Sequence, residues 1–206
     1  KRDMPMNFAI DGPVGAGKSS IADQVAQRLH ILHLDTGAMY RTVALYMLRN
    51  GIDPQDEQTV SAHCGEADVR VAYRDGAQRT MLGGEDVSDL IRTGEVSAAA
   101  SAISKWPAVR RRMVAAQREI AATADMLIDG RDIGTRVLID APVKIFLTAT
   151  PEERARRRYR QQIEKGDMTP YGQAEDAVLV DSTNMTPEQV VDAIIAVVED
   201  VYGKRA

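Results

Sequence analysis

The run Gly12-Pro13-Val14-Gly15-Ala16-Gly17-Lys18-Ser19 decides the fold of this chain. It matches the pattern G-x-x-x-x-G-K-[ST] at every required position. Glycines let the backbone curl so that successive N–H groups point inward at phosphate oxygens, and the helix that follows adds the positive end of its dipole. We therefore predict a phosphate-binding loop (P-loop) in which Lys18 reaches the β- and γ-phosphates and the Ser19 hydroxyl ligates Mg²⁺.

The sequence on both sides of the loop predicts strands that alternate with helices. Residues 6–11 form a short apolar run before the loop, and residues 18–29 after it place Ile21, Val25 and Leu29 at four-residue steps. Further strands are expected at residues 31–34, 126–129, 143–147 and 177–180, with helices between them and a last helix after Thr186. This order predicts an α/β fold, a P-loop NTPase-like five-stranded parallel sheet flanked by helices.

Residues 68–88 have a different pattern from the rest of the chain. Val69, Val71 and Tyr73 alternate with polar residues, and Asp75-Gly76 is a turn signal before a second short run. This pattern is typical of antiparallel strands and not of a strand–helix unit. We therefore expect a small antiparallel hairpin inserted between the helices of the parallel fold.

Length, charge and cysteine content narrow the class of protein. The length of 206 residues predicts one domain with a small insert. The net charge of −4 disfavours nucleic acid as a partner. The single cysteine, Cys64, excludes a disulfide within this sequence, and we expect it to be a half-buried packing residue. No run of about 18 apolar residues and no leader pattern is present, so we expect a cytoplasmic protein.

Arginines recur where three predicted strands end, in residues 35–41, 129–134 and 154–160. Ligands of open α/β sheets bind at the carboxyl ends of the strands. A kinase for a phosphorylated acceptor must bring two polyanions together, and arginine forks offset the repulsion between them. These clusters therefore indicate such a kinase, although each of them also fits a solvated surface paired with nearby acids.

Other P-loop proteins remain as alternatives at this point. The guanine-reading pattern N-K-x-D of GTPases is absent from the sequence. Neither Asp35 nor Asp129 excludes a motor-type ATPase, because each follows an apolar strand. A kinase for thymidylate, adenylate or shikimate is the main enzymatic alternative, and a non-catalytic ATP-binding protein is the alternative from another class.

Six runs in order give a specific resemblance: IDGPVGAGKSS, LDTGAMYR, GEDVSDLIR, AAASAISKWPAVR, DGRDIGT, and DAPVKIFLTAT followed after Pro151 by EERARRR. Their order and spacing resemble those of the bacterial cytidylate kinases, from about Phe8 to Gly166 and again from Ala177 onward. The resemblance implies transfer of the γ-phosphoryl group of ATP to CMP or dCMP with Mg²⁺, in a monomer with a mobile lid. It also implies one domain of three parts: a core (6–35, 124–150, 177–206), a monophosphate-binding region with the insert (36–123) and a lid (151–176).

The resemblance assigns roles residue by residue. It implies that Gly12 through Ser20 hold the ATP phosphates. Beside the Mg²⁺ expected at Ser19, Asp35 and Asp129 are the nearest candidates for ligands through water or for holding the arginines in place. Catalytic roles are implied for Lys18, Arg41, Arg131, Arg154 and Arg158. Contacts to CMP are implied for Thr36, Tyr40, Arg41, Ser101, Arg110, Asp129, Arg131 and Asp132.

The implied cytosine contacts make chemical sense. Cytosine offers a 4-amino donor beside the N3 and O2 acceptors, so Asp132 can accept while Arg110 and Ser101 donate. Uracil presents the opposite pattern and would mismatch this set.

The resemblance fails at residues 167–176, which are considerably fewer than the family's lid segment. We expect that either the printed sequence omits residues here or the chain has lost them. In the second case catalysis should be badly impaired, because the family's missing arginines belong to the closed state.

Overall fold

The computed structural model describes residues 5–154 and 174–203. The chain forms two compact units. The first unit comprises the chain up to Leu34 and from Ala121 onward, and the second comprises Asp35–Ile120.

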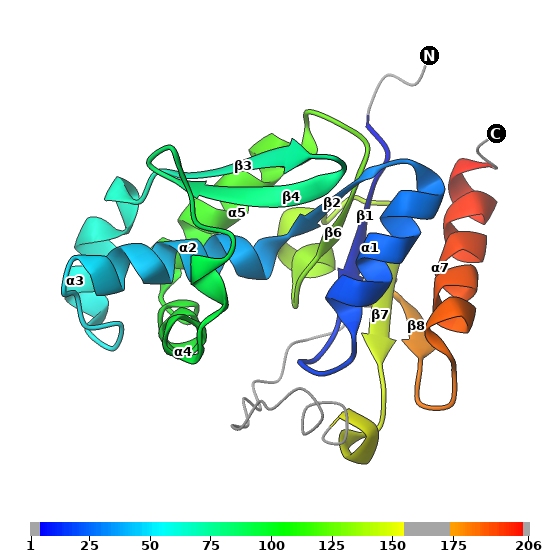
Figure 1. Ribbon diagram of the computed structural model, residues 1–206. Helices are drawn as coiled ribbons and strands as arrows, with labels where there is room; N and C mark the ends of the chain where they lie inside the picture. Colours follow the sequence, from blue (N-terminus) through cyan, green and yellow to red (C-terminus); the bar gives the residue numbers. More distant parts are fainter. Residues whose placement is uncertain (1–4, 155–173, 204–206) are drawn as a thin grey trace. The chain divides into compact units, whose positions relative to one another are not determined.

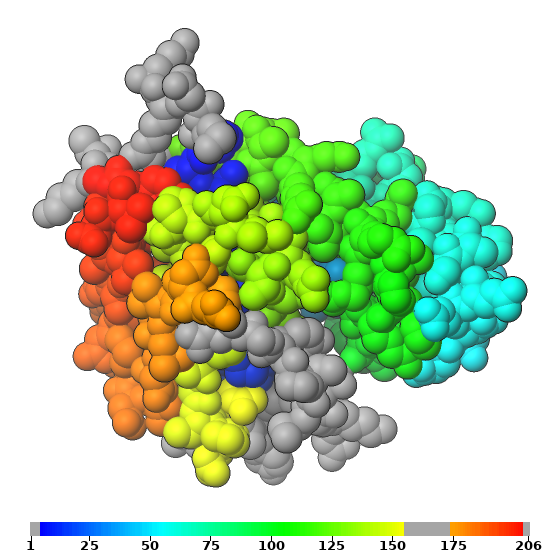
Figure 2. Space-filling view, turned by 180° about the vertical axis from the view of Figure 1, so that it is seen from behind, coloured from blue at the N-terminus to red at the C-terminus, as the bar shows by residue number. Residues whose placement is uncertain are grey.

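The first unit is built on a five-stranded sheet with the order β2-β6-β1-β7-β8. The strands are β1 (Asn7–Asp11), β2 (Leu32–Asp35), β6 (Met126–Asp129), β7 (Lys144–Thr148) and β8 (Val178–Asp181). β1 pairs in parallel with β6 and β7, and β7 pairs in parallel with β8. The predicted five-stranded parallel sheet is therefore confirmed. β8 forms one edge, where Val178 and Leu179 are exposed, and Figure 2 shows this orange strand at the surface.

Two helices pack on the sheet through apolar stripes. α1 (Lys18–Leu29) and α7 (Pro187–Tyr202) lie side by side in Figure 1. The predicted positions Ile21, Val25 and Leu29 of α1 are buried with Val190, Val191, Ile194 and Val198 of α7 against Phe8, Ile10 and Leu147 of the sheet. α7 begins as predicted, because Thr186 accepts from the backbone N–H of Gln189 and the Gln189 side chain accepts from that of Thr186.

The second unit joins helices to a small antiparallel sheet. Its helices are α2 (Thr36–Arg49), α3 (Glu57–His63), α4 (Gly94–Ile103) and α5 (Pro107–Ala121). β3 (Val69–Arg74), β4 (Ala77–Leu82) and β5 (Glu85–Asp86) form the sheet, with Val71 opposite Thr80 and Tyr73 opposite Gln78. The predicted hairpin is confirmed, and β5 adds a third, short strand.

Several predicted bounds differ by a residue. Strands expected at 31–34, 143–147 and 177–180 each begin one residue later and end one residue later. The later end of β2 reflects Asp35, which ends the strand and also caps α2, so the strand continues to the helix without a loop. Cys64 is buried. In the two described ranges, no helix is long and apolar enough to cross a membrane.

Candidate active site

The P-loop leaves β1 in close contact with β7. A Cβ on Gly12 would lie 2.0 Å from the carbonyl oxygen of Leu147, so only glycine fits there. Gly15 and Gly17 have φ values of 83° and 85°, in the left-handed region that favours glycine. Gly17 is also the N-cap of α1 and offers no capping side chain, which leaves the helix end suited to a phosphate group.

Lys18 and Ser19 occupy the first turn of α1, as the motif predicts. The Lys18 ammonium donates to the carbonyl oxygen of Pro13 at 3.1 Å, within the loop itself. The Ser19 hydroxyl donates to Oδ2 of Asp129 at 2.9 Å. The P-loop is therefore tied directly to the acid that ends β6.

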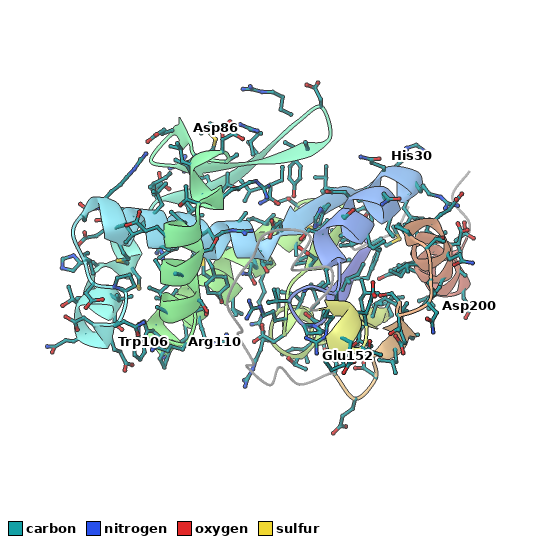
Figure 3. All side chains as sticks on the ribbon, turned by 60° about the horizontal axis from the view of Figure 1, so that its bottom comes forward. His30, Asp86, Trp106, Arg110, Glu152 and Asp200 are labelled. Carbon is teal, nitrogen blue, oxygen red and sulfur yellow. The ribbon has the colours of Figure 1, made fainter. Side chains whose placement is uncertain are left out.

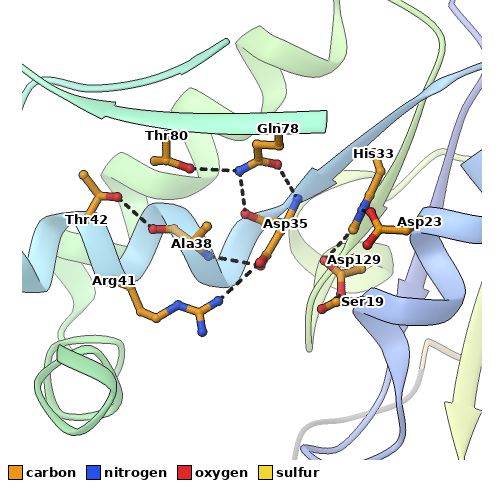
Figure 4. A network of polar contacts seen from close by, with 10 residues as sticks. All are labelled: Ser19, Asp23, His33, Asp35, Ala38, Arg41, Thr42, Gln78, Thr80 and Asp129. Atoms are coloured by element: carbon orange, nitrogen blue, oxygen red, sulfur yellow. Dashed lines mark hydrogen bonds and ion pairs between the residues drawn. The ribbon is translucent and has the colours of Figure 1, made fainter. Parts of the chain in front are cut away.

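Asp129 belongs to a chain of charges in which it and His33 are buried and Asp23 is exposed (Figure 4). His33 Nε2 lies 3.1 Å from Asp129 Oδ1, and His33 Nδ1 lies 2.7 Å from Asp23 Oδ1. Burial opposes a charge on His33, but hydrogen bonds to the two carboxylates outweigh it and raise the pKa of His33 to about 10. The imidazole is therefore cationic and donates to both acids. Burial disfavours the charge on Asp129 too, but His33, Lys18 and Ser19 hold its pKa below the ordinary value.

A second buried acid, Asp11, holds the loop after β6. Asp11 Oδ1 and Oδ2 accept from the backbone N–H groups of Ile133 and Gly134, each at 2.8 Å. Burial raises the pKa of Asp11 to about 6, although both hydrogen bonds act in the opposite direction. A Cβ on Gly134 would lie 3.3 Å from Asp11 Oδ2 and 3.1 Å from Lys144 Cδ, so a side chain there would crowd both residues. Asp11, the residue before the P-loop, is thus hydrogen-bonded to the backbone that directly follows Arg131 and Asp132.

Neither Asp11 nor His33 was among the sequence-predicted site residues. Asp11 directly precedes the P-loop. An acid at the end of an apolar strand is the sequence feature that could have identified it as a site residue. His33 is a titratable residue inside an apolar strand, where it must find partners if buried.

The first unit holds most of the predicted site residues. Lys18 and Ser19 lie in the first turn of α1, Asp129 ends β6, and Arg131 and Asp132 lie in the turn after β6. Arg154 donates from Nε to the carbonyl oxygen of Ala149 at 3.1 Å. It lies beside a shallow hollow lined by Thr150, Glu152, Glu153, Thr183 and Asn184. Arg158 and residues 167–173 of the shortened segment lie outside the described residues.

In the second unit, Asp35 organises the start of α2 (Figure 4). Its Oδ1 accepts from the backbone N–H of Ala38 at 3.0 Å, and its Oδ2 accepts from Arg41 Nη2 at 3.2 Å. The Nε of Arg41 is buried and has no hydrogen-bond partner within the described residues. Thr36 is buried and Tyr40 half-buried on the same turn.

Ser101 and Arg110 are both hydrogen-bonded to Ser104, at the corner between α4 and α5. Arg110 Nη1 donates to the carbonyl oxygen of Ser104 at 3.4 Å, and the Ser104 hydroxyl donates to that of Ser101 at 2.9 Å. Trp106 lies at the same end of the unit as Arg110 (Figure 3), and its Nε1 donates to Pro54 at 3.0 Å. Two predicted contacts to cytosine are therefore neighbours in this unit.

Comparison with known proteins gives one family. The sequence profile described as Cytidylate kinase matches residues 8–171. The chain is 43% identical to a cytidylate kinase of Caldicellulosiruptor bescii, with 92% of this chain and 94% of that protein covered. It is 46% identical to a cytidylate kinase of Mycolicibacterium paratuberculosis, with 89% and 91% covered.

Solved structures give the same fold at low identity. A gluconokinase of Sinorhizobium meliloti matches with a TM-score of 0.51 at 14% identity, covering 97% of this chain and 95% of that one. A sugar kinase of Janibacter sp. matches with a TM-score of 0.50 at 15% identity, covering 97% and 96%. These likenesses concern the fold alone.

Proposed function

Because the chain belongs to the cytidylate kinase family, we propose that it transfers the γ-phosphoryl group of ATP to CMP or dCMP, giving ADP with CDP or dCDP. The observation that carries this proposal is the family match, which spans the P-loop, Arg41 and Arg131. The first unit would bind ATP, and the second would supply much of the monophosphate site. We propose that the enzyme acts as a monomer.

The ATP phosphates would lie in the P-loop, from Gly12 through Ser20, at the positive end of α1. Mg²⁺ is usually held by one or two protein oxygens together with substrate phosphates. The Ser19 hydroxyl beside the ionised Asp129 carboxylate fits that requirement, with Asp35 as a further candidate ligand through water. The described residues contain no cluster of three or more acids, histidines or cysteines that would hold a metal by itself. When bound, Mg²⁺ would neutralise charge that develops on the transferred phosphate.

The CMP phosphate would be bound by arginine forks at Arg41 and Arg131, with Thr36 and Tyr40 beside it. The buried Nε of Arg41 supports this assignment, because a buried donor without a partner is costly. A phosphate oxygen would provide that partner. The second Arg41 donor, Nη2, is already held by Asp35, so the guanidinium is pre-oriented before any ligand arrives.

The cytosine ring would be read by Ser101, Arg110 and Asp132, as the donor and acceptor pattern of the base requires. Ser101 and Arg110 share the corner between α4 and α5, which supports their acting together.

Catalysis would depend on position and charge. The CMP phosphate is already an anion, so one of its oxygens attacks the γ-phosphorus without a general base, and the bond from that phosphorus to the ADP oxygen breaks. Lys18, Arg41, Arg131, Arg154 and Arg158 would stabilise the charge spread over the transferred group.

The test is release of ADP from ATP and Mg²⁺ with CMP, dCMP, UMP, AMP, dTMP and shikimate as acceptors. We expect turnover to be greatest with CMP and dCMP, and Lys18→Ala to abolish it. Turnover only with another acceptor would assign a different small-molecule kinase. ATP binding without turnover on any acceptor would assign a non-catalytic nucleotide-binding protein.

A further inference from the structure

The side chain of Gln78, on β4 of the antiparallel insert, hydrogen-bonds both backbone groups of one residue. Its Oε1 accepts from the N–H of Asp35 at 2.7 Å, and its Nε2 donates to the carbonyl oxygen of Asp35 at 3.2 Å. Nε2 also lies 3.3 Å from the hydroxyl of Thr80. The contact joins residues 43 positions apart, so it fixes the insert to the start of α2.

A glutamine suits this position for a chemical reason. A backbone N–H and the C=O of the same residue need an acceptor and a donor side by side, and the carboxamide group supplies both without charge. Glutamate keeps the acceptor and loses the donor, and leucine fills a similar volume with neither.

Because Asp35 is held in place, it also restricts the position of the Arg41 guanidinium. Its carboxylate caps α2 through Ala38 and accepts from Arg41 Nη2 at 3.2 Å. The space around this pair is narrow, since a Cβ on Gly37 would lie 3.0 Å from Asp35 Oδ1 and 3.4 Å from Arg41 Nη2. A shift of the Asp35 backbone would therefore move the carboxylate, and the carboxylate holds the guanidinium.

We propose that Gln78 is a positioning residue that fixes Asp35 and thereby aims Arg41 at the phosphate of the acceptor nucleotide. The insert then contributes to acceptor binding through a residue that touches no substrate. This inference rests on the proposed function, because it takes Arg41 as a ligand of the CMP phosphate. A purely structural role for Gln78 would stabilise the unit without any preference between substrates.

The test compares Gln78→Leu and Gln78→Glu with Arg70→Ala in the full chain. Arg70 is the matched control, since it lies on the same small sheet, is exposed and pairs only with Asp68 among the described residues. Loss of one or two hydrogen bonds of about 1 kcal/mol each predicts a roughly five- to thirtyfold rise in the KM for CMP with Gln78→Leu. We expect the KM for ATP of Gln78→Leu to change less than twofold. The KM for CMP of Gln78→Glu should lie between the values of wild type and Gln78→Leu. Thermal unfolding identifies any variant that has simply lost its fold.

A double-mutant cycle separates positioning from packing. In an Arg41→Ala background, Gln78→Leu should leave the KM for CMP unchanged, because the residue it positions is gone. An equal rise in both backgrounds, or a rise no larger than that of Arg70→Ala, would overturn the proposal.

A measurement without substrate keeps the inference distinct from the proposed function. The side-chain Nε–H signal of Arg41 in an NMR spectrum, assigned by its loss in Arg41→Lys, should shift in Gln78→Leu and stay in place in Arg70→Ala. An unmoved signal would refute the inference even if CMP is a good substrate. If the signal shifts but the protein phosphorylates no CMP, the positioning of Arg41 by Gln78 stands and the proposed function is refuted.

Discussion

His33 Nε2 lies 3.1 Å from Asp129 Oδ1, with both side chains less than 10% exposed. A cation on one strand of the sheet is thus held against the anion that ends the neighbouring strand, and that anion also accepts from Ser19 of the P-loop. A buried pair of this kind contributes little net stability when intact, but removing one partner is costly because the other charge is left uncompensated.

Replacing His33 should therefore destabilise the protein. For His33→Gln we expect a loss of about 3 kcal/mol in the free energy of unfolding, measured by urea titration at pH 7. The matched control is His63→Gln, because His63 is exposed and pairs with the exposed Glu66 at 3.0 Å. The imidazolium interpretation fails if both variants lose the same small amount.

The same histidine predicts the behaviour of the protein at alkaline pH. The pKa of His33 is raised in the folded chain to about 10 from an ordinary value of 6.5. Its stabilising contribution is thus fully present below pH 6.5 and is lost as pH rises to about 10. Unfolding free energies of wild type and His33→Gln, measured from pH 6 to 10, should converge as pH rises. A constant difference across this range would contradict the raised pKa.

Asp11 predicts an effect of the same sign, a loss of stability with rising pH, in the acidic range. Its pKa is raised by burial to about 6, so the folded chain keeps a proton that the unfolded chain releases near pH 3.8. Wild-type stability should fall across this window, and Asp11→Asn should remove that fall. The stability of Asp11→Asn relative to wild type should therefore rise by up to about 3 kcal/mol between pH 4 and 6, and then level off. A flat difference would show that Asp11 titrates normally.

The parts of the fold that the sequence predicts well depend on local signals. The bounds of α1 and β6 were predicted to the residue, because glycines and apolar spacing mark them. α3 was not predicted, since its seven residues bury only Val60 and therefore show no apolar period.

The site was predicted less completely than the fold. Asp11, His33 and Gln78 act through partners up to 123, 96 and 43 positions away, and no pattern along the chain shows such pairs. The P-loop residues were predicted because their chemistry lies within one turn of backbone.

Gly12 gives a steric prediction for the P-loop. Gly12→Ala would place a Cβ against the Leu147 carbonyl oxygen, a backbone atom of the sheet that cannot move aside cheaply. We expect ATP binding, measured by calorimetry, to weaken at least roughly tenfold through distortion of the loop. Gly65→Ala is the control, because a Cβ there meets nothing within 4 Å. Unchanged ATP affinity in Gly12→Ala would show that the loop can relax away from β7.

Arg110 offers the sharpest test of the cytosine site, because the next residue is its control. Arg110 is half-buried at the corner between α4 and α5, whereas Arg111 on the same helix is exposed. Hydrogen bonds from a charged group contribute about 1.5–3 kcal/mol, so Arg110→Gln should raise the KM for CMP roughly 10- to 100-fold. The KM for ATP should stay within a factor of two, and Arg111→Gln should change neither constant. If Arg110→Gln raises the KM for CMP no more than Arg111→Gln does, Arg110 is a surface residue and the base is read elsewhere.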